Sequence, residues 1–256
     1  MLLRSDDDGV IAIGQPAHAW LSGQLARAWG NERFGAVEPR EEVCLAAEQH
    51  DAGMAEWERR PERSPATGLP RSFMELELDA HLAIWWSAAP LVLSQSRYAA
   101  LLVSLHGSAL YERRDPARLA PADADRVRAF LAGQRELQER LLAGLRADSR
   151  TAAAADDRTV RRNRRLVWTW DSLSLGLLLG WAPFELAAVP AAGDDITIAV
   201  RGDAGAVRLD PWPFRADRVA VRCEGRRLTG RFDDTTAMRD ALAAAPWVTL
   251  EFVLAP

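Results

Sequence analysis

Hydrophobic positions recur at helical spacing through the first 180 residues of the chain. Residues 121–145 are the clearest case, because Val127, Phe130, Leu137 and Leu141 share one face of an otherwise polar segment. An interval rich in proline, residues 57–73, is predicted to be irregular. The same spacing predicts a short strand at 9–13 and helices at 15–29, 41–54, 75–89, 94–112, 121–145 and 158–180.

After Pro190 the pattern changes to the alternation of half-buried strands. Glu224-Gly225 is interpreted as a hairpin turn between two of them. The pattern predicts a mainly α protein, in which a helical domain (residues 1–190) carries a smaller C-terminal β-rich (α+β) subdomain (residues 191–256). Within that subdomain we expect a short helix at 235–245 and strands at 196–200, 206–209, 218–222, 226–232 and 247–253.

Composition narrows the class of protein. Hydrophobic residues make up 48% and charged residues 27% of the 256 positions, as in ordinary globular domains. A net charge of -4 gives no reason to expect a nucleic-acid partner or an anionic membrane surface. All 32 basic residues are arginine, so a Schiff-base lysine is excluded.

Two further features concern the compartment. Cys44 and Cys223 lie far apart and are too few for a disulfide framework, which favours a reduced, cytoplasmic setting. The apolar stretch 173–190 is interrupted by Gly176, Gly180 and Glu185, so it is interpreted as a buried helix followed by a turn and not as a membrane span.

The candidate chemistry is concentrated in a few imidazole and carboxylate groups. Each histidine falls on a different predicted helix, and Asp51 follows His50 directly. Asp171 lies in the apolar half of the last long helix, where an ionised carboxylate needs a partner. Any one of these residues alone is explained as well by an ordinary hydrogen bond. Taken together they favour a metal site, because these groups are the usual ligands of zinc, manganese and iron: His18, His50, Asp51, His81, His106 and Asp171.

The order His, His-Asp, His, His, Asp resembles that of the HD-domain superfamily over about residues 10–180. The stretches 15–18, 47–53, 98–106 and 171–175 look similar to an uncharacterised family of HD-like proteins. The resemblance implies an HD-like helical bundle that binds two divalent metal ions (iron, manganese or zinc). His18, His50, Asp51 and Asp171 would hold one ion. His81 and His106 would hold the other, with Asp51 bridging both as the catalytic carboxylate.

The activity that the resemblance implies is metal-dependent hydrolysis of a phosphorylated, anionic small molecule. Two alternatives stay open: a di-iron oxygenase on the same ligands, and a metal-binding or interaction protein without turnover, which includes a homo-oligomer. The chain departs from many HD phosphodiesterases, which carry lysine three residues after the aspartate. Here Met54 stands at that position, and methionine donates no hydrogen bond to a phosphate, which argues against hydrolysis of a cyclic dinucleotide.

Arginines and tryptophans allow two interpretations each. Arginine binds phosphate through two hydrogen bonds, so the loop that carries Arg59, Arg60, Arg63 and Arg71 is a candidate for holding an anionic substrate, although a solvated charge is the simpler interpretation. The run 161–165 is interpreted as a solvated helix face that pairs with residues 156–157. Four tryptophans either wall a pocket or pack in the core: Trp85, Trp86, Trp168 and Trp170.

Overall fold

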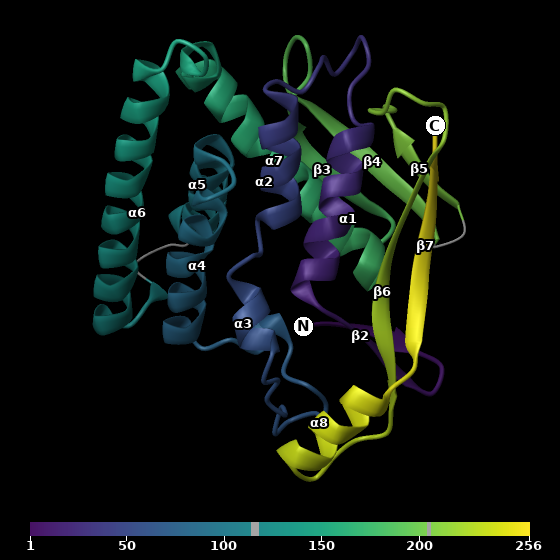
Figure 1. The fold of residues 1–256 in the computed structure, drawn as a ribbon. Coiled ribbons are helices and arrows are strands. Elements are labelled where there is room, and N and C mark those ends of the chain that lie inside the picture. The colour runs from purple at the N-terminus through teal and green to yellow at the C-terminus, as the bar shows by residue number, and fades with distance from the viewer. Residues whose placement is uncertain (114–117, 204–205) are drawn as a thin grey trace.

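The computed structural model describes residues 1–113, 118–203 and 206–256, and one sheet of seven strands organises them (Figure 1). The strands are β1 (Leu2–Asp6), β2 (Gly9–Ile13), β3 (Phe184–Val189), β4 (Ile196–Asp203), β5 (Ala206–Asp210), β6 (Val219–Thr229) and β7 (Trp247–Ala255). The helices are α1 (Gln15–Ala28), α2 (Arg40–Gln49), α3 (Met54–Glu58), α4 (Leu78–Leu93), α5 (Arg97–Glu112), α6 (Pro121–Ala147), α7 (Asp157–Leu179) and α8 (Thr235–Ala244).

The sheet joins the two ends of the chain. Its strand order is β1-β2-β6-β7-β5-β4-β3, and every neighbouring pair is antiparallel except β5 and β7. The N-terminal strand β2 pairs with β6 from Gly9 opposite Thr229 to Ala12 opposite Arg226. On its other side β6 pairs with β7 over its whole central part. The N-terminal hairpin therefore completes a sheet whose middle comes from the C-terminal quarter.

Helices cover the sheet in layers (Figure 1). α1 contacts β6, α2 and α7, while α7 also contacts β1 and β3, so these two helices form the layer next to the strands. α5 packs against α2 and α7, and α4 and α6 pack against α5 on the side away from the sheet. The site described below lies where α1, α2, α5 and α7 meet.

Buried aromatic rings fix this layer to the sheet side of the molecule. Trp29, which follows α1, is fully buried and packs edge-on against three other rings. The ring centroids lie 5.4 Å from Phe34, 5.8 Å from Trp170 and 5.4 Å from Phe214. Edge-to-face packing at such distances stabilises beyond the area that it buries. Trp170 immediately precedes Asp171, so this packing also fixes that part of α7.

The fold is α+β, and the expectation of a mainly α, HD-like bundle with a small β-rich appendage was wrong. The hydrophobic pattern did not predict two of the strands, β1 and β3. β1 contains Arg4 and Asp6 and is followed by further acids, so its charge concealed its extended backbone. β3 lies inside the stretch 173–190 that was interpreted as a helix and a turn. α7 ends at Leu179, and β3 begins five residues later.

Gly225 was misread for a physical reason. β6 runs unbroken from Val219 to Thr229, with Gly225 in its interior and no turn there. A Cβ atom at Gly225 would lie 2.6 Å from Cγ2 of Ile11 and 3.1 Å from the carbonyl oxygen of Ala12. The glycine therefore permits close approach of β2, a role that a glycine in a strand interior often has.

The apolar stretch around α7 also bears on the membrane question. In the described part of the chain, no helix is long and apolar enough to cross a membrane.

Candidate metal centre

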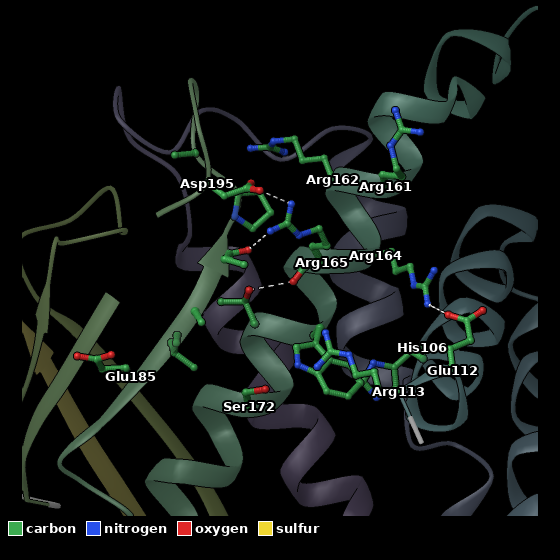
Figure 2. Close-up of a pocket in the computed structure, with 18 of the residues that line it drawn as sticks. His106, Glu112, Arg113, Arg161, Arg162, Arg164, Arg165, Ser172, Glu185 and Asp195 are labelled. Carbon is green, nitrogen blue, oxygen red and sulfur yellow. Dashed lines mark hydrogen bonds and ion pairs between the residues drawn. The ribbon is translucent and has the colours of Figure 1, made fainter. Parts of the chain in front are cut away.

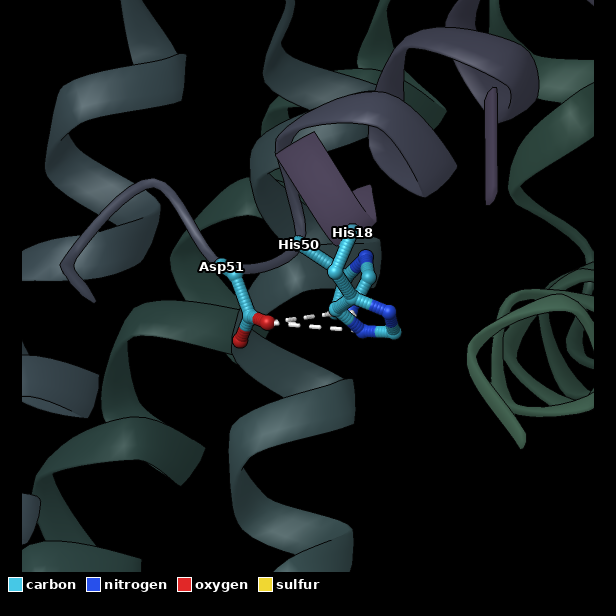
Figure 3. Close-up of side chains that lie close together, drawn as sticks. All are labelled: His18, His50 and Asp51. Carbon is cyan, nitrogen blue, oxygen red and sulfur yellow. Dashed lines mark hydrogen bonds and ion pairs between the residues drawn. The ribbon is translucent and has the colours of Figure 1, made fainter. Parts of the chain in front are cut away.

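Four predicted ligands, from three separate parts of the chain, converge in the interior. His18 lies on α1, His50 and Asp51 lie at the end of α2, and Asp171 lies on α7. Figure 3 shows His18, His50 and Asp51 pointing toward one another. The Nε2 atoms of His18 and His50 are 3.2 Å apart. Oδ1 of Asp171 lies 3.0 Å and 3.3 Å from these two nitrogens, and Oδ2 of Asp51 lies 3.6 Å and 3.4 Å from them.

These separations match the edges of a metal coordination shell. Nitrogen and oxygen ligands bind zinc at about 2.0–2.2 Å, so neighbouring ligand atoms in a tetrahedral or octahedral shell lie about 3.0–3.5 Å apart. Both imidazoles direct the same atom, Nε2, into the cluster, and each carboxylate directs one oxygen. His18, His50 and Asp51 form one group whose ligand atoms all lie within 4.8 Å of one another, and Oδ1 of Asp171 lies within 3.3 Å of both imidazole nitrogens.

The tautomer of His50 is set by the backbone. Its Nδ1–H donates to the carbonyl oxygen of Ala47 at 2.8 Å, because a carbonyl only accepts. Nε2 is therefore the basic nitrogen that faces the cluster. Burial opposes charging of the ring, yet the carboxylates of Asp51 and Asp171 outweigh burial and raise the pKa of His50 to about 9. The cluster thus attracts positive charge, either a proton or a metal ion.

His18 is held by a second hydrogen bond of the kind that orients metal ligands. The hydroxyl of Ser174 donates to the backbone carbonyl of Asp171 at 2.9 Å, which leaves its oxygen to accept Nδ1–H of His18 at 2.9 Å. The hydroxyl oxygen of Ser22 lies 2.8 Å from the hydroxyl oxygen of Ser174. His18 therefore also presents Nε2 as its basic atom.

The pKa values of the two carboxylates shift in opposite directions, although burial acts on both in the same way. Burial raises the pKa of Asp51, which is only 6% exposed. Burial acts in the same direction on Asp171, but hydrogen bonds with His18 and His50 hold its pKa well below the usual range. Asp171 is therefore ionised at neutral pH, and an ionised buried carboxylate requires a cationic partner.

The His50-Asp51 dipeptide owes its position to the turn that follows α2. The amide of Met54 donates to the carbonyl of Asp51 at 2.9 Å, which closes this turn before α3 begins. Gly53 packs directly on α4, because a Cβ atom there would lie 2.3 Å from the carbonyl oxygen of Ile84. The sequence His-Asp-Ala-Gly thus combines two ligands with the glycine that seats them.

His106 adds a third imidazole at the edge of the cluster. Its Nε2 lies 3.7 Å from Oδ2 of Asp171, and His50, His106 and Asp171 form a second group with metal-ligand spacing in the described part of the chain. The rings of Trp85 and Trp168 pack against it at 5.5 Å and 5.4 Å. Burial lowers the pKa of His106 to about 3, so this imidazole is neutral and able to coordinate a metal.

His81 is the predicted ligand that the structure does not bring into either group. Its Nε2 accepts a hydrogen bond from Nε1 of Trp85 at 3.1 Å, and its Nδ1 is hydrogen-bonded to the hydroxyl of Tyr111. Both ring nitrogens are therefore engaged outside the cluster. Trp85 contacts His81 and His106 alike, so His81 supports the wall of the site.

A pocket of about 720 Å³ opens beside His106, between α7, the end of α5 and β3 (Figure 2). Trp168, Thr169 and Ser172 line it next to His106. Farther out its lining is arginine-rich: Arg113, Arg158, Arg161, Arg162, Arg164 and Arg165. Only three carboxylates accompany these six arginines among the described lining residues, which leaves an excess of positive charge.

Sequence reasoning missed this pocket. The run 161–165 was interpreted as a solvated face that pairs with residues 156–157, but Arg164 pairs with Glu112 and Arg165 with Asp195. One signal was present in the sequence, because Arg164, Trp168 and Asp171 recur at the four- and three-residue steps that share a helix face. Of the loop arginines considered instead, Arg59 pairs with Glu56 and Arg71 with Glu62.

A second depression, of about 560 Å³, reaches Asp51. Its lining is mainly apolar, with Pro16, Trp20 and Leu91, and its charged members besides Asp51 are Glu48 and Glu56. The acidic lining disfavours an anionic ligand here and distinguishes this depression from the arginine-rich pocket.

Fold and site together define an α+β protein with a buried His/Asp cluster between its helices. A family model described as a protein of unknown function, DUF3891, matches residues 1–230, so the chain belongs to the DUF3891 family. No curated protein and no solved structure matches it. The resemblance to the HD-domain superfamily was wrong, because the curled mixed sheet is not a helical HD bundle and no comparison supports that family.

Proposed function

We propose that the protein is a metal-dependent hydrolase that acts on a phosphorylated small molecule. One observation carries the proposal: the Nε2 atoms of His18 and His50 lie 3.2 Å apart in the interior, and a carboxylate oxygen of Asp51 and one of Asp171 each lie 3.0–3.6 Å from both. The donor set of two imidazoles and two carboxylates suits zinc, manganese or iron. The group His50, His106 and Asp171 is an alternative ligand set for the ion, because the one basic nitrogen of His50, Nε2, belongs to both groups.

A bound divalent ion supplies Lewis acidity and a water of lowered pKa at neutral pH. The residues of the chain supply the rest. Ser174 and the carbonyl of Ala47 hold the two imidazoles in the coordinating tautomer. Asp51 lines the second depression, so in this proposal its carboxylate would accept the proton of a water that enters from that side. The arginine-rich pocket favours an anionic substrate on the side of His106.

The proposed setting is the cytoplasm. Cys44 and Cys223 are both free and buried, as expected for a protein in a reducing compartment.

Hydrolysis after controlled metal loading tests the proposal. Protein freed of metal with a chelator would be reloaded with manganese, zinc or ferrous iron. It would then be assayed against a panel of phosphate monoesters, diesters and nucleotides. Asp171→Asn keeps the shape of the side chain but removes its charge, and we expect a loss of activity of more than about a hundredfold. His81→Gln is the matched control, because His81 lies outside both ligand groups, and it should retain most activity.

Two results would count against a hydrolase. Activity that survives both chelation and Asp171→Asn would show that the cluster has no part in catalysis. Metal binding without turnover of any phosphoester under any metal would instead identify a metal-binding protein that is not a hydrolase.

A further inference from the structure

We infer that the arginine-rich pocket is a second anion subsite, so that the substrate carries a non-reacting phosphate in addition to the group at the metal centre. The inference rests on the proposed function for the identity of the reacting group. The subsite itself is argued from α7, which carries Asp171 into the cluster and the arginines into the pocket (Figure 2).

The spacing along α7 sets the length of the ligand. Seven residues separate Asp171 from Arg164 and ten separate it from Arg161, which correspond to roughly 10 Å and 15 Å at 1.5 Å per residue. Helical side chains lean toward the N-terminus, so the guanidinium groups lie no nearer to the cluster than their backbone. An anion held by Arg161 or Arg164 is therefore about 10 Å or more from the metal centre.

Not all of the arginines are neutralised. Arg164 pairs with Glu112, and Arg165 pairs with Asp195 while donating to the carbonyl of Ala188. Among the described residues, Arg113, Arg158, Arg161 and Arg162 line the pocket without a carboxylate partner, although Arg162 donates to the carbonyl of Phe34. Arg113 lies at the end of α5 and Arg161 near the start of α7 (Figure 2). Arg113 and Arg161 are therefore candidates to hold a phosphate, which accepts paired hydrogen bonds from a guanidinium.

The ring of Trp168, which packs on His106 at the edge of the cluster, positions Arg113. Its guanidinium carbon lies 4.0 Å from the centroid of Trp168, within the range of a cation–π contact. Trp168 packs on His106, and His106 approaches Asp171. A continuous series of contacts thus connects the cluster to Arg113. Nδ1 of His106 is buried without a hydrogen-bond partner among the described residues.

The substrate class that fits is an elongated molecule with two phosphate groups, one at each end. A pocket of this size accommodates a ligand of ordinary metabolite dimensions. The acidic second depression near Asp51 does not compete for the remote phosphate, because Glu48 and Glu56 repel it.

Three synthetic probes test the subsite: hexane-1,6-diol bisphosphate, hexyl phosphate and ethane-1,2-diol bisphosphate. The long bisphosphate spans both positions, the monoester lacks the second anion, and the short bisphosphate has the same phosphates without the reach. Titration calorimetry of metal-loaded protein should give at least roughly tenfold tighter binding of the long bisphosphate than of either other probe, as expected for a charge-assisted contact.

Arg113→Gln combined with Arg161→Gln should abolish that advantage, whereas Arg59→Gln, which removes an exposed arginine outside the pocket, should preserve it. Equal affinity of the long bisphosphate and hexyl phosphate, or an advantage that survives the double substitution, would overturn the subsite. Failure of the metal centre has a different signature. If the protein binds no metal but the double substitution still weakens its affinity for hexyl phosphate, the subsite stands and the hydrolase does not.

Discussion

His50 experiences burial, which opposes a charge, and two carboxylates, which favour one. The carboxylates prevail, and the pKa of His50 is raised to about 9 in the protein without metal. Below that pH the imidazole holds a proton that a metal ion must displace, so acid weakens metal binding. We expect the apparent metal affinity to rise by about tenfold for each pH unit between pH 6 and pH 8. Competition with a chelating dye at several pH values measures this slope.

The direction of this pH dependence tests whether a ligand loses a proton when the metal binds. An affinity that stays constant over the two pH units would mean that no ligand loses a proton on binding, contrary to the environment of His50. Arg59→Gln is a suitable control protein, because its side chain is exposed and lies outside the cluster.

Gly53 is the residue through which packing acts on the ligands. In Gly53→Ala the new Cβ would lie 2.3 Å from the carbonyl oxygen of Ile84, so the turn that carries Asp51 must shift. We expect the free energy of unfolding to fall by about 1–3 kcal/mol, as for other overpacked sites, and metal affinity to fall with it. Urea denaturation and metal titration measure the two effects. Gly193→Ala is the matched control, because no atom lies within 4 Å of the new Cβ, and equal behaviour of the two variants would refute this role.

At the scale of single residues, the sequence predicted the cluster better than its surroundings. The rarity of histidine, the order of the candidate ligands and the position of Asp171 in an apolar helix selected six residues, and five of them converge: His18, His50, Asp51, His106 and Asp171. His81 looked equivalent in the sequence, because its hydrogen bonds with Trp85 and Tyr111 depend on how α4 and α5 pack. Arg113 and Arg161 could not be associated for the same reason, since they line one pocket from two different helices.

At the scale of elements, α7 links the candidate metal centre to the pocket, and its N-cap is Asp156. The carboxylate of Asp156 accepts hydrogen bonds from the amides of Arg158 and Thr159 at 2.9 Å and 3.0 Å. We expect Asp156→Ala to lower the free energy of unfolding by about 1 kcal/mol, the usual contribution of such a cap. Chemical denaturation at pH 7 measures it, with the exposed Asp125→Ala on α6 as the control that should change little.

Acid should erase this difference. Hydrogen bonds with Thr159 lower the pKa of Asp156 in the folded protein. A lowered folded pKa stabilises above the unfolded pKa, and the stabilisation is lost as the pH falls through the folded value. The gap between wild type and Asp156→Ala should therefore narrow below pH 4. A gap that widens in acid would show that Asp156 acts in another way.

Helices were easier to predict than strands because their signal is longer. The amphipathic stripe of α6 was visible in the sequence, and α5 and α6 both form within a few residues of the expected bounds. β1 and β3 are short, carry charged or exposed positions and become strands only through their partners. Gly225 looked like a turn because the sequence does not reveal how closely β2 approaches β6.

At the scale of the whole molecule, the sheet binds the helical part to the C-terminal strands. The division at residue 190 stays a prediction, and the pairing of β2 with β6 gives a reason to test it. A chain of residues 1–190 would lose β6 and expose Ile11 and Ile13, which are buried in the core. We expect this fragment to lack cooperative thermal unfolding in circular dichroism, whereas the full chain unfolds in one transition. A fragment that melts cooperatively and binds metal would establish the helical part as an independent domain.

Metal content after purification without chelator tests the central claim most directly. Elemental analysis should find at least one equivalent of zinc, manganese or iron per chain in the wild-type protein and in His81→Ala. His50→Ala should retain less than a tenth of that content while keeping the circular dichroism spectrum of the wild type. A wild-type chain that takes up no transition metal even on reconstitution, or a His50→Ala variant that binds metal as the wild type does, would contradict the account.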